Sequence, residues 1–337
     1  MHGSERVSRS TPRTAPGSAV PPDSTRPPAR RLRRLRTRLG VLGAAVTMVA
    51  TWMMPAPAGA APRLPVPYSF AAGIAAQLAA PGSAPPGAND FGCRPSAAHP
   101  RPVILLHGTL GNMTDSWQAL SPLLKNNGYC VFALNYGGAP GLFQGYGDIA
   151  DSAAQLDTFV DRVRTATGAD RVDLVGHSQG GGALPRYYLQ VAGGAAKVHD
   201  LVGLAPSSHG ANLGAILNLL DAFPGGRAAF DRLCPACTQQ DRGSAFMRAL
   251  DALPDTVPGV RYTMIESRYD EVIVPYTLAF LTGPNVRNVT VQDHCGLDFS
   301  DHLAIIYDRV ALNEVLNALD PTRTTRACAL SLPVLGG

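Results

Sequence analysis

The sequence has few lysines, no apolar run of membrane-spanning length and no internal repeat. Lys125 and Lys197 are the only lysines among 29 basic residues. The most apolar run, residues 39–54, is shorter than the roughly 20 residues that a transmembrane helix needs. These absences exclude a repeat architecture and argue against a retained membrane anchor. A hydrophobic fraction of 45%, with 35 glycines and 29 prolines, indicates one sizeable domain with a loop-rich periphery.

The first 60 residues have the layout of an export signal. Arginines cluster between residues 30 and 38, the apolar run follows, and the segment ends in Pro55-Ala56-Pro57-Ala58-Gly59-Ala60. A basic region, an apolar region and an Ala-x-Ala end are the parts of a cleavable signal peptide. We therefore predict cleavage after Ala60 and a secreted, extracellular protein without stable membrane insertion.

Removal of this segment reverses the sign of the net charge. The precursor has a formal net charge of +4, but residues 1–60 hold 10 of its 29 basic residues and two of its 25 acidic residues. The remaining chain has 19 basic and 23 acidic residues, a net charge of −4. The basic balance thus belongs to the export signal and gives no reason to expect nucleic-acid binding.

All six cysteines follow residue 60, and an even number in an exported chain predicts disulfides. Pairing neighbours along the chain gives Cys93–Cys130, Cys234–Cys237 and Cys295–Cys328. The Cys-x-x-Cys pair lacks the strand–helix–strand surroundings of a redox motif, so we predict a structural cross-link there. Further zinc ligands at suitable spacing are absent nearby, and we expect no metal and no cofactor.

The centre of the chain carries a Gly-x-Ser-x-Gly motif between a strand pattern and a helix pattern. Apolar residues in 171–175 predict a buried strand, the motif is Gly176-His177-Ser178-Gln179-Gly180, and residues 183–189 are helix-like. This order is the context of a nucleophile elbow, in which a serine occupies a strained turn. Glycines flank the serine because larger side chains would collide with the neighbouring strand and helix. We predict that Ser178 is a nucleophile; the alternative is a glycine-rich turn with an incidental serine.

Apolar strand patterns alternate with helix patterns through most of the chain. The predicted strands cover residues 103–106, 129–136, 171–175, 198–205, 260–266 and 286–291, and the main predicted helices cover residues 117–125, 148–167, 183–189 and 303–319. Such alternation predicts an α/β fold with a mostly parallel central sheet and helices on both faces. In such sheets, ligands bind at the carboxyl ends of the strands.

Two segments depart from this alternation. Residues 61–100 are rich in proline and alanine, and we predict an extended arm with a short helix at 69–78, followed by a catalytic domain at 101–337. Within residues 207–258 an apolar stretch precedes the Cys-x-x-Cys motif. We predict a lid or cap insertion at the rim of the site. An ordinary packed helix and loop is the alternative.

A serine nucleophile needs a base, and the base needs an acid that orients it. The motif implies the chain order serine, acid, histidine, and only His294 and His302 follow the last predicted strand. His302 lies at a loop-to-helix junction and is the predicted base, with His294 as the alternative. Asp270 in the turn after the preceding strand is the predicted acid, preferred to Glu266 and Glu271. Three later aspartates are interpreted as solvated or capping residues: Asp293, Asp298 and Asp301.

The negative oxygen of the transition state needs two backbone N–H donors. One belongs to the residue after the nucleophile, Gln179. The other follows the strand that ends at His107-Gly108, which makes it Thr109. We expect His107 to hydrogen-bond only to loop backbone, and we expect a disulfide at Cys295 to brace the loop of the base.

The chain resembles the secreted bacterial lipases of the α/β-hydrolase superfamily, in particular the actinobacterial class 2 triacylglycerol lipases. Four motifs between residues 100 and 310 carry the resemblance: Leu105-Leu106-His107-Gly108-Thr109, Gly176-His177-Ser178-Gln179-Gly180-Gly181, Tyr269-Asp270-Glu271-Val272-Ile273-Val274-Pro275 and Asp301-His302. The resemblance implies hydrolysis of carboxylic esters through an acyl-enzyme on Ser178, with long-chain glycerides as substrates. Some related lipases carry a structural calcium ion, and we identify no acidic cluster in this sequence to assign to it.

Several other functions use the same residues or the same fold. A short-chain carboxylesterase or an acyltransferase has the same triad and differs in the ester or in the alcohol that takes the acyl group. A peptidase shares the chemistry, whereas a binding protein of this fold is expected to lose a triad member, and none is lost here. The choice between a lipase and a short-chain esterase depends on the apolar residues of the insertion, which either face lipid or belong to the core. These residues are Ile216, Leu217, Leu219 and Leu220.

Overall fold

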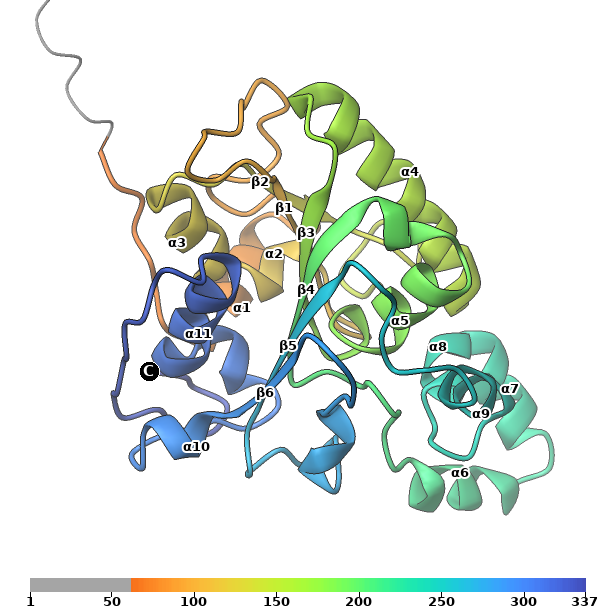
Figure 1. Ribbon diagram of the computed structural model, residues 1–337. Helices are drawn as coiled ribbons and strands as arrows, with labels where there is room; N and C mark the ends of the chain where they lie inside the picture. Colours follow the sequence, from red (N-terminus) through yellow and green to blue (C-terminus); the bar gives the residue numbers. More distant parts are fainter. Residues whose placement is uncertain (1–61) are drawn as a thin grey trace, which may run out of the picture. The chain divides into compact units, whose positions relative to one another are not determined.

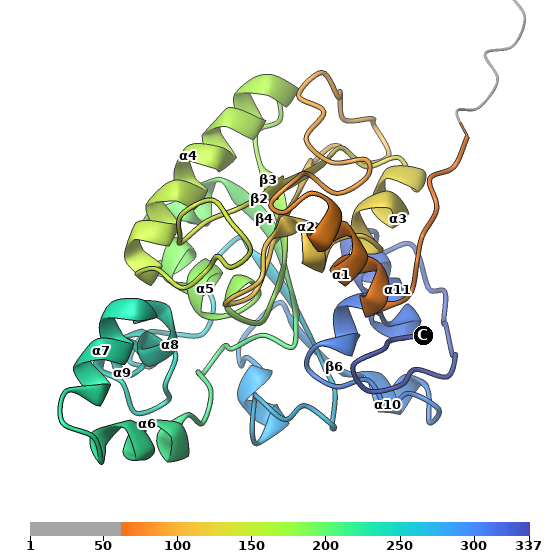
Figure 2. The ribbon, with the colours of Figure 1, turned by 180° about the vertical axis from the view of Figure 1, so that it is seen from behind.

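The computed structural model describes residues 62–337, apart from the side chains of residues 215 and 216. The predicted export signal and its cleavage site lie outside the described residues. Figures 1 and 2 show the arrangement of the described part from opposite sides. None of its helices combines the length and the apolar character needed to cross a membrane.

Six parallel strands form the central sheet in the order β2-β1-β3-β4-β5-β6. The strands are β1 Val103–Leu106, β2 Val131–Leu134, β3 Val172–His177, β4 Val198–Leu204, β5 Arg261–Glu266 and β6 Val286–Thr290. Each predicted strand is present, although β2 is shorter at both ends than its pattern. The sequence prediction of a parallel α/β sheet is confirmed.

The strands are apolar throughout because both faces of the sheet are covered. In β1, Val103 and Leu105 belong to one hydrophobic core, whereas Ile104 and Leu106 belong to the other. All four side chains are fully buried. Successive strand residues point to opposite faces, so an unbroken apolar run fills both cores at once.

Helices cover both faces, as predicted (Figures 1 and 2). The first core packs the sheet against α3 Leu120–Asn126, α11 Arg309–Leu319 and the 3-10 helix Ala304–Tyr307. The second core packs it against α4 Ile149–Thr167, α5 Ala183–Gln190 and α9 Ala245–Asp251. Asp148 caps α4 by accepting hydrogen bonds from the amides of Ala150 and Asp151, and Gly168 ends the helix in a left-handed conformation.

The predicted helix at 117–125 is present but begins later, at Leu120, and a separate short helix that was not predicted precedes it. Two short helices occupy this region, α2 Met113–Ser116 and α3. Asn112 starts α2 because its side chain accepts hydrogen bonds from the Thr114 and Asp115 amides. The chain leaves helical geometry at Trp117, whose side chain is fully buried.

The predicted helix at 303–319 is divided into two elements. Asp308 is extended, with φ −84° and ψ 131°, and separates the 3-10 helix Ala304–Tyr307 from α11. Its side chain accepts a hydrogen bond from the Ala311 amide at 2.7 Å. An aspartate at this position is a helix start signal, so this boundary was accessible from the sequence. The last predicted strand is also shorter, since α10 Val291–His294 begins where β6 ends.

The two segments outside the alternation contain more helix than the sequence indicated. The arm carries α1 Phe70–Ala79, one residue from its predicted position. The insertion holds four helices: α6 Gly214–Asp221, α7 Gly226–Leu233, α8 Pro235–Gln239 and α9. Helices α6, α7 and α8 lie beside one another at one side of the sheet in both ribbon views (Figures 1 and 2).

Three disulfides link the described residues in the predicted pairs. They are Cys93–Cys130, Cys234–Cys237 and Cys295–Cys328. The first ties the arm to the residue before β2, the second closes the turn that starts α8, and the third ties the C-terminal tail to the end of α10.

Candidate active site

The elbow places Ser178 at the carboxyl end of β3. The serine has φ 53°, in the left-handed region that non-glycine residues seldom adopt, and it starts the 3-10 helix Ser178–Gly180. A Cβ atom on Gly176 would lie 1.8 Å from the Gly180 carbonyl oxygen. A Cβ atom on Gly180 would lie 2.4 Å from the carbonyl oxygens of Leu106 and His107. Both glycines of the motif are therefore required by backbone contacts.

Three side chains that are far apart in the sequence meet at this end of the sheet. His302 Nε2 lies 3.0 Å from Ser178 Oγ, and His302 Nδ1 lies 2.6 Å from Asp270 Oδ2. All three residues are buried, with exposed fractions of 5 to 8%. The structure thus brings together the predicted nucleophile, base and acid, with the histidine between the other two.

Asp270 is held as a carboxylate. Its Oδ1 atom accepts hydrogen bonds from the amides of Val272 and Ile273, each at 2.7 Å. Burial raises the pKa of Asp270, but the hydrogen bond and the charge of His302, together with the two amides, lower it below its usual value. The charged form at neutral pH suits an acid that orients an imidazole and stabilises its protonated form.

The alternative base and the alternative acids make other contacts. His294 Nδ1 faces Glu314 at 3.2 Å, not Ser178. Glu271 accepts a hydrogen bond from the backbone amide of His302 at 3.2 Å, and Glu266 is completely buried at the end of β5.

The interpretation of the later aspartates is partly wrong. Asp301 caps the turn after it by accepting from the amides of Leu303 and Ala304. Asp298 is neither solvated nor a helix cap, because it is completely buried and binds the amide and hydroxyl of Ser300.

The loop after β1 and the residue after the nucleophile are joined by side chains. Gln179 Nε2 donates to Thr109 Oγ1 at 3.0 Å and to the Gly145 carbonyl at 2.7 Å. Gln240, which directly follows α8, donates to the same Thr109 hydroxyl at 2.8 Å. The sequence analysis missed Gln240, since 131 residues separate it from Thr109 and no local pattern marks it.

Two histidines support the site without contacting Ser178 Oγ. His177 Nε2 donates to the backbone carbonyl of His302 at 2.8 Å. Burial, followed by the charge of His302, lowers the pKa of His177 to about 3, so this imidazole stays neutral. His107 Nδ1 donates to the Gly108 carbonyl at 2.8 Å, as the sequence predicted, and burial lowers its pKa to about 4. The support that His177 gives to the base was not predicted.

Two apolar cavities adjoin these residues. One, of about 270 Å³, is lined by Ser178 and His302 and by Ala211, Leu213 and Ile273, among others. A second, of about 280 Å³, shares two residues with the first and is lined by the arm helix, Leu110 and Phe143. The shared residues are Thr109 and Leu303. The serine therefore lies next to space suited to hydrocarbon chains.

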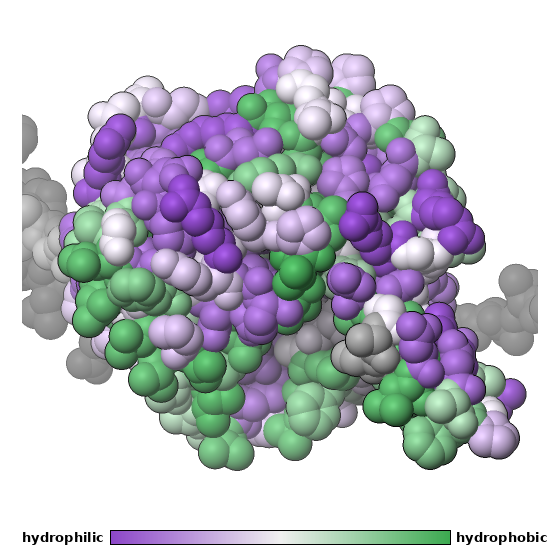
Figure 3. All heavy atoms as spheres, turned by 90° about the horizontal axis from the view of Figure 1, so that it is seen from below, coloured by the Kyte–Doolittle hydropathy of each residue, from purple (hydrophilic) through white to green (hydrophobic). Residues whose placement is uncertain are grey.

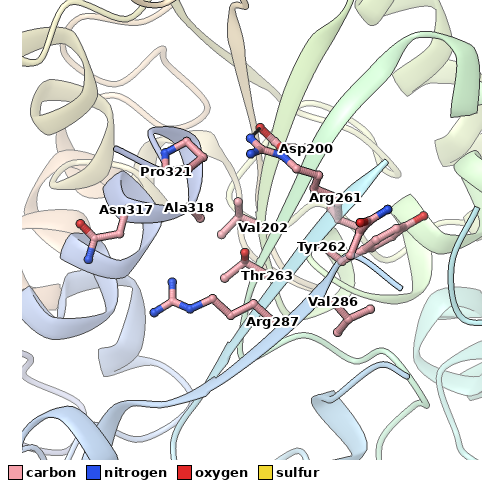
Figure 4. Close-up of a pocket in the computed structure, with 12 residues that line it drawn as sticks. Asp200, Val202, Arg261, Tyr262, Thr263, Val286, Arg287, Asn317, Ala318 and Pro321 are labelled. Atoms are coloured by element: carbon pink, nitrogen blue, oxygen red, sulfur yellow. Dashed lines mark hydrogen bonds and ion pairs between the residues drawn. The ribbon is translucent and has the colours of Figure 1, made fainter. Parts of the chain in front are cut away.

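A further cavity, of about 310 Å³, lies at the amino ends of β5 and β6 (Figure 4), and Ser178 does not line it. Its wall includes Asp200, which binds Arg261 at 2.6 Å. Asp173, His199 and Asp200 lie within 4.8 Å of one another, the spacing of a metal site. Arg101 forms an ion pair with Asp173, and Arg261 forms one with Asp200. The two arginines therefore compensate the negative charges of the cluster, and a metal ion is not needed for that purpose.

A parallel sheet of this strand order, with the elbow after β3 and the histidine after the last strand, is the arrangement of the α/β-hydrolases, and the fold places the protein in that class. Residues 100–313 match the model of the lipase (class 2) family. The chain belongs to the class 2 lipase family.

Curated relatives match a shorter stretch. A triacylglycerol lipase of Pseudarthrobacter phenanthrenivorans is 39% identical over 101 residues, which are 28% of this chain and 30% of the relative. A triacylglycerol lipase of Burkholderia plantarii is also 39% identical over 101 residues, covering 28% of this chain and 27% of the relative. The chain thus spans under a third of the length of either relative.

Two solved structures support the fold. Aspergillus fumigatus lipase B superposes with a TM-score of 0.56 at 20% identity, covering 72% of this chain and 58% of that one. The mature form of Bacillus licheniformis lipase BlEst2 superposes with a TM-score of 0.51 at 17% identity, covering 71% of this chain and 96% of that one. At these identities the similarity concerns the fold alone.

Proposed function

We propose that the protein is a serine hydrolase that cleaves carboxylic esters of lipids, as a triacylglycerol lipase does. The contact of 3.0 Å between His302 Nε2 and Ser178 Oγ carries this proposal. A serine hydroxyl is a poor nucleophile until a base within hydrogen-bond reach takes its proton. Membership of the class 2 lipase family supports the same reaction.

The reaction proceeds in two halves. Ser178 Oγ attacks the ester carbonyl while His302 Nε2 takes the hydroxyl proton, which forms a tetrahedral intermediate. His302 then gives this proton to the alcohol as the ester bond breaks, and the acyl group remains on Ser178. In the second half, His302 takes a proton from water as the water oxygen attacks the acyl carbon. His302 then gives this proton to Ser178 Oγ as the bond to the acyl group breaks, which releases the acid and restores the serine. Asp270 keeps the imidazole in the required tautomer throughout.

The oxyanion is held by the backbone N–H groups of Thr109 and Gln179. Support comes from the position of Thr109 in the wall of the cavity that holds Ser178, and from the hydrogen bond between the two side chains. Two donors fixed before the reaction stabilise the negative oxygen without reorganisation, and loss of one such donor typically costs about 3–4 kcal/mol of barrier.

Lipid esters are the substrate class that the surroundings of Ser178 favour. The two adjoining cavities are lined mainly by apolar side chains. Around them, Ile74, Leu110, Phe143 and Leu303 are 38 to 62% exposed. Figure 3 shows hydrophobic residues gathered on the face seen from below. An exposed apolar rim suits binding at a lipid–water interface. The names of the two triacylglycerol lipase relatives agree with this class.

The proposal also covers two other parts of the chain: the insertion at 207–258 as a cap, and the N-terminal segment as an export signal. The insertion supplies Ala211, Leu213 and Gln240 to the cavity wall, which supports a role as a cap over the acyl chain. Secretion after cleavage at Ala60 is supported by the three disulfides, since such bonds persist in oxidising compartments.

Hydrolysis assays with two esters test the proposal. The wild-type protein is expected to hydrolyse both emulsified triolein and p-nitrophenyl butyrate, and Ser178→Ala is expected to hydrolyse neither. Activity on the butyrate alone would leave a short-chain esterase. A Ser178→Ala protein with either activity would contradict the mechanism.

A further inference from the structure

The N-terminal arm forms part of the second apolar cavity beside the site, the one of about 280 Å³. Its lining includes Phe70 and Ile74 of α1, together with Leu110 and Phe143 from the loops after β1 and β2. Phe70 and Ile74 are four residues apart, so both lie on one face of the helix. The arm therefore contributes an apolar surface next to the reacting residues.

Buried amide side chains fix the segments around this cavity to one another. The carbonyl oxygen of Leu142, in the loop after β2, accepts hydrogen bonds from Gln77 of α1 at 2.8 Å and from Asn112 at the start of α2 at 3.0 Å. Gln77 and Asn112 are both buried. A Cβ atom on Gly73 would lie 2.3 Å from the Asp115 carbonyl oxygen, so α1 packs directly against α2. The cavity is thus preformed, as ligand sites usually are, whereas ordinary protein interiors contain few voids of this size.

The reaction assigns the two halves of an ester to different places. The acyl group becomes bonded to Ser178 Oγ, so it occupies the cavity that Ser178 lines. Ser178 does not line the second cavity. The alcohol oxygen takes its proton from His302 as it leaves, and the next residue, Leu303, belongs to the walls of both cavities. The second cavity therefore adjoins the point from which the alcohol leaves.

We propose that the second cavity binds the alcohol portion of the ester and that α1 determines which alcohols are accepted. This inference rests on the proposed function, because it assigns the acyl group to Ser178. An apolar lining favours alcohols that carry hydrocarbon, such as a glycerol that still bears acyl chains, over methanol or ethanol. Ile74 and Phe143 are 44% and 62% exposed, so the wall of the cavity reaches the protein surface and leaves room for a further chain.

Two isomeric esters, octyl acetate and ethyl octanoate, distinguish the two cavities. They contain the same atoms, but the long chain is on the alcohol side in the first and on the acyl side in the second. The quantity to compare is the ratio of kcat/KM for octyl acetate to kcat/KM for ethyl octanoate, measured with both esters dissolved as monomers. Because each protein is compared with the wild type, differences in the intrinsic reactivity of the two esters cancel.

Ile74→Trp narrows the second cavity, and we expect this ratio to fall about tenfold. The partial exposure of Ile74 leaves room for the larger side chain in the folded protein. Ala75→Trp is the matched control, because Ala75 is exposed on the same helix and lines neither cavity. We expect the ratio of the control to equal that of the wild type.

An unchanged ratio in Ile74→Trp overturns the inference, and so does an equal fall in the two tryptophan variants. A raised ratio also overturns it, since the cavity would then bind the acyl chain. If Ile74→Trp fails to fold, Phe143→Ala decides: it removes apolar wall from the same cavity, and we expect the ratio to fall at least about threefold. A wild-type protein that hydrolyses neither ester contradicts the proposed function itself. A wild type that hydrolyses both, with a ratio that these variants do not lower, contradicts only the role of α1 and its cavity.

Discussion

Gln240 donates a hydrogen bond from Nε2 to Thr109 Oγ1 at 2.8 Å. Its other amide atom, Oε1, accepts from Ser207 Oγ at 2.8 Å, so both ends of the side chain are bound. Gln240 belongs to the insertion, whereas Thr109 belongs to the loop after β1 that we propose as half of the oxyanion site. The insertion therefore fixes part of the site in addition to covering it.

Replacement of Gln240 by leucine is expected to lower kcat for p-nitrophenyl butyrate about tenfold and to change KM little. A loop that holds an oxyanion donor less firmly stabilises the transition state less, and a tenfold effect corresponds to about 1.4 kcal/mol. Gln190→Leu is the control. Gln190 is the last residue of α5, and its side chain donates a hydrogen bond to the Pro254 carbonyl and not to Thr109. Equal kcat values for the two variants would show that Gln240 does not hold the loop.

The identity of the base is tested by two histidine variants. His302→Ala is expected to reduce kcat by roughly 10⁴-fold, because Ser178 loses the group that takes its proton. His294→Ala is expected to retain most of the activity, since His294 faces Glu314. Steady-state kinetics with p-nitrophenyl butyrate measures both. A nearly inactive His294→Ala with an active His302→Ala would reverse the assignment.

The close backbone contacts around the motif glycines predict that a larger residue there lowers the stability of the fold. Gly180→Ala would place a Cβ atom 2.4 Å from two backbone carbonyl oxygens, and backbone cannot move aside as a flexible side chain can. We expect a loss of about 3 kcal/mol or more in unfolding free energy, or no folded protein. Gly296→Ala is the matched control, because nothing lies within 4 Å of its added Cβ. Similar melting temperatures for the two variants would contradict the crowding of the elbow.

A buried pair of carboxyl groups predicts how stability changes with pH. Burial, followed by the charge of Asp298, raises the pKa of Asp308 from 3.8 to about 7. Between these values the folded protein binds a proton that the unfolded chain has lost, so stability falls as the pH rises through this range. Each unit of difference corresponds to about 1.4 kcal/mol.

Asp308→Asn tests this pH dependence while keeping an oxygen that caps α11. We expect the variant to gain stability relative to the wild type as the pH rises from about 4 to about 7, measured by urea unfolding at several pH values. Asp170→Asn, at an exposed position, serves as the control. Parallel stability curves for the wild type and Asp308→Asn would contradict the raised pKa.

The sheet and the three residues proposed as a triad could be predicted from the sequence because both follow local patterns in a fixed order. The apolar run of β1, the glycines around Ser178 and the order of Asp270 and His302 are all readable along the chain. The break at Asp308 was missed because the apolar pattern continues across it, although Asp308 is a recognisable cap. The contacts of Gln240 and His177 depend on tertiary packing, and no spacing in the sequence brings these side chains to the site.

Covalent labelling with a fluorophosphonate tests the central claim most directly, because this reagent phosphonylates an activated serine hydroxyl. We expect the wild-type protein to gain the mass of one adduct, peptide mapping to place it on Ser178, and Ser178→Ala to remain unlabelled. An adduct on a different residue, or equal labelling of Ser178→Ala, would contradict the assignment of Ser178 as the nucleophile.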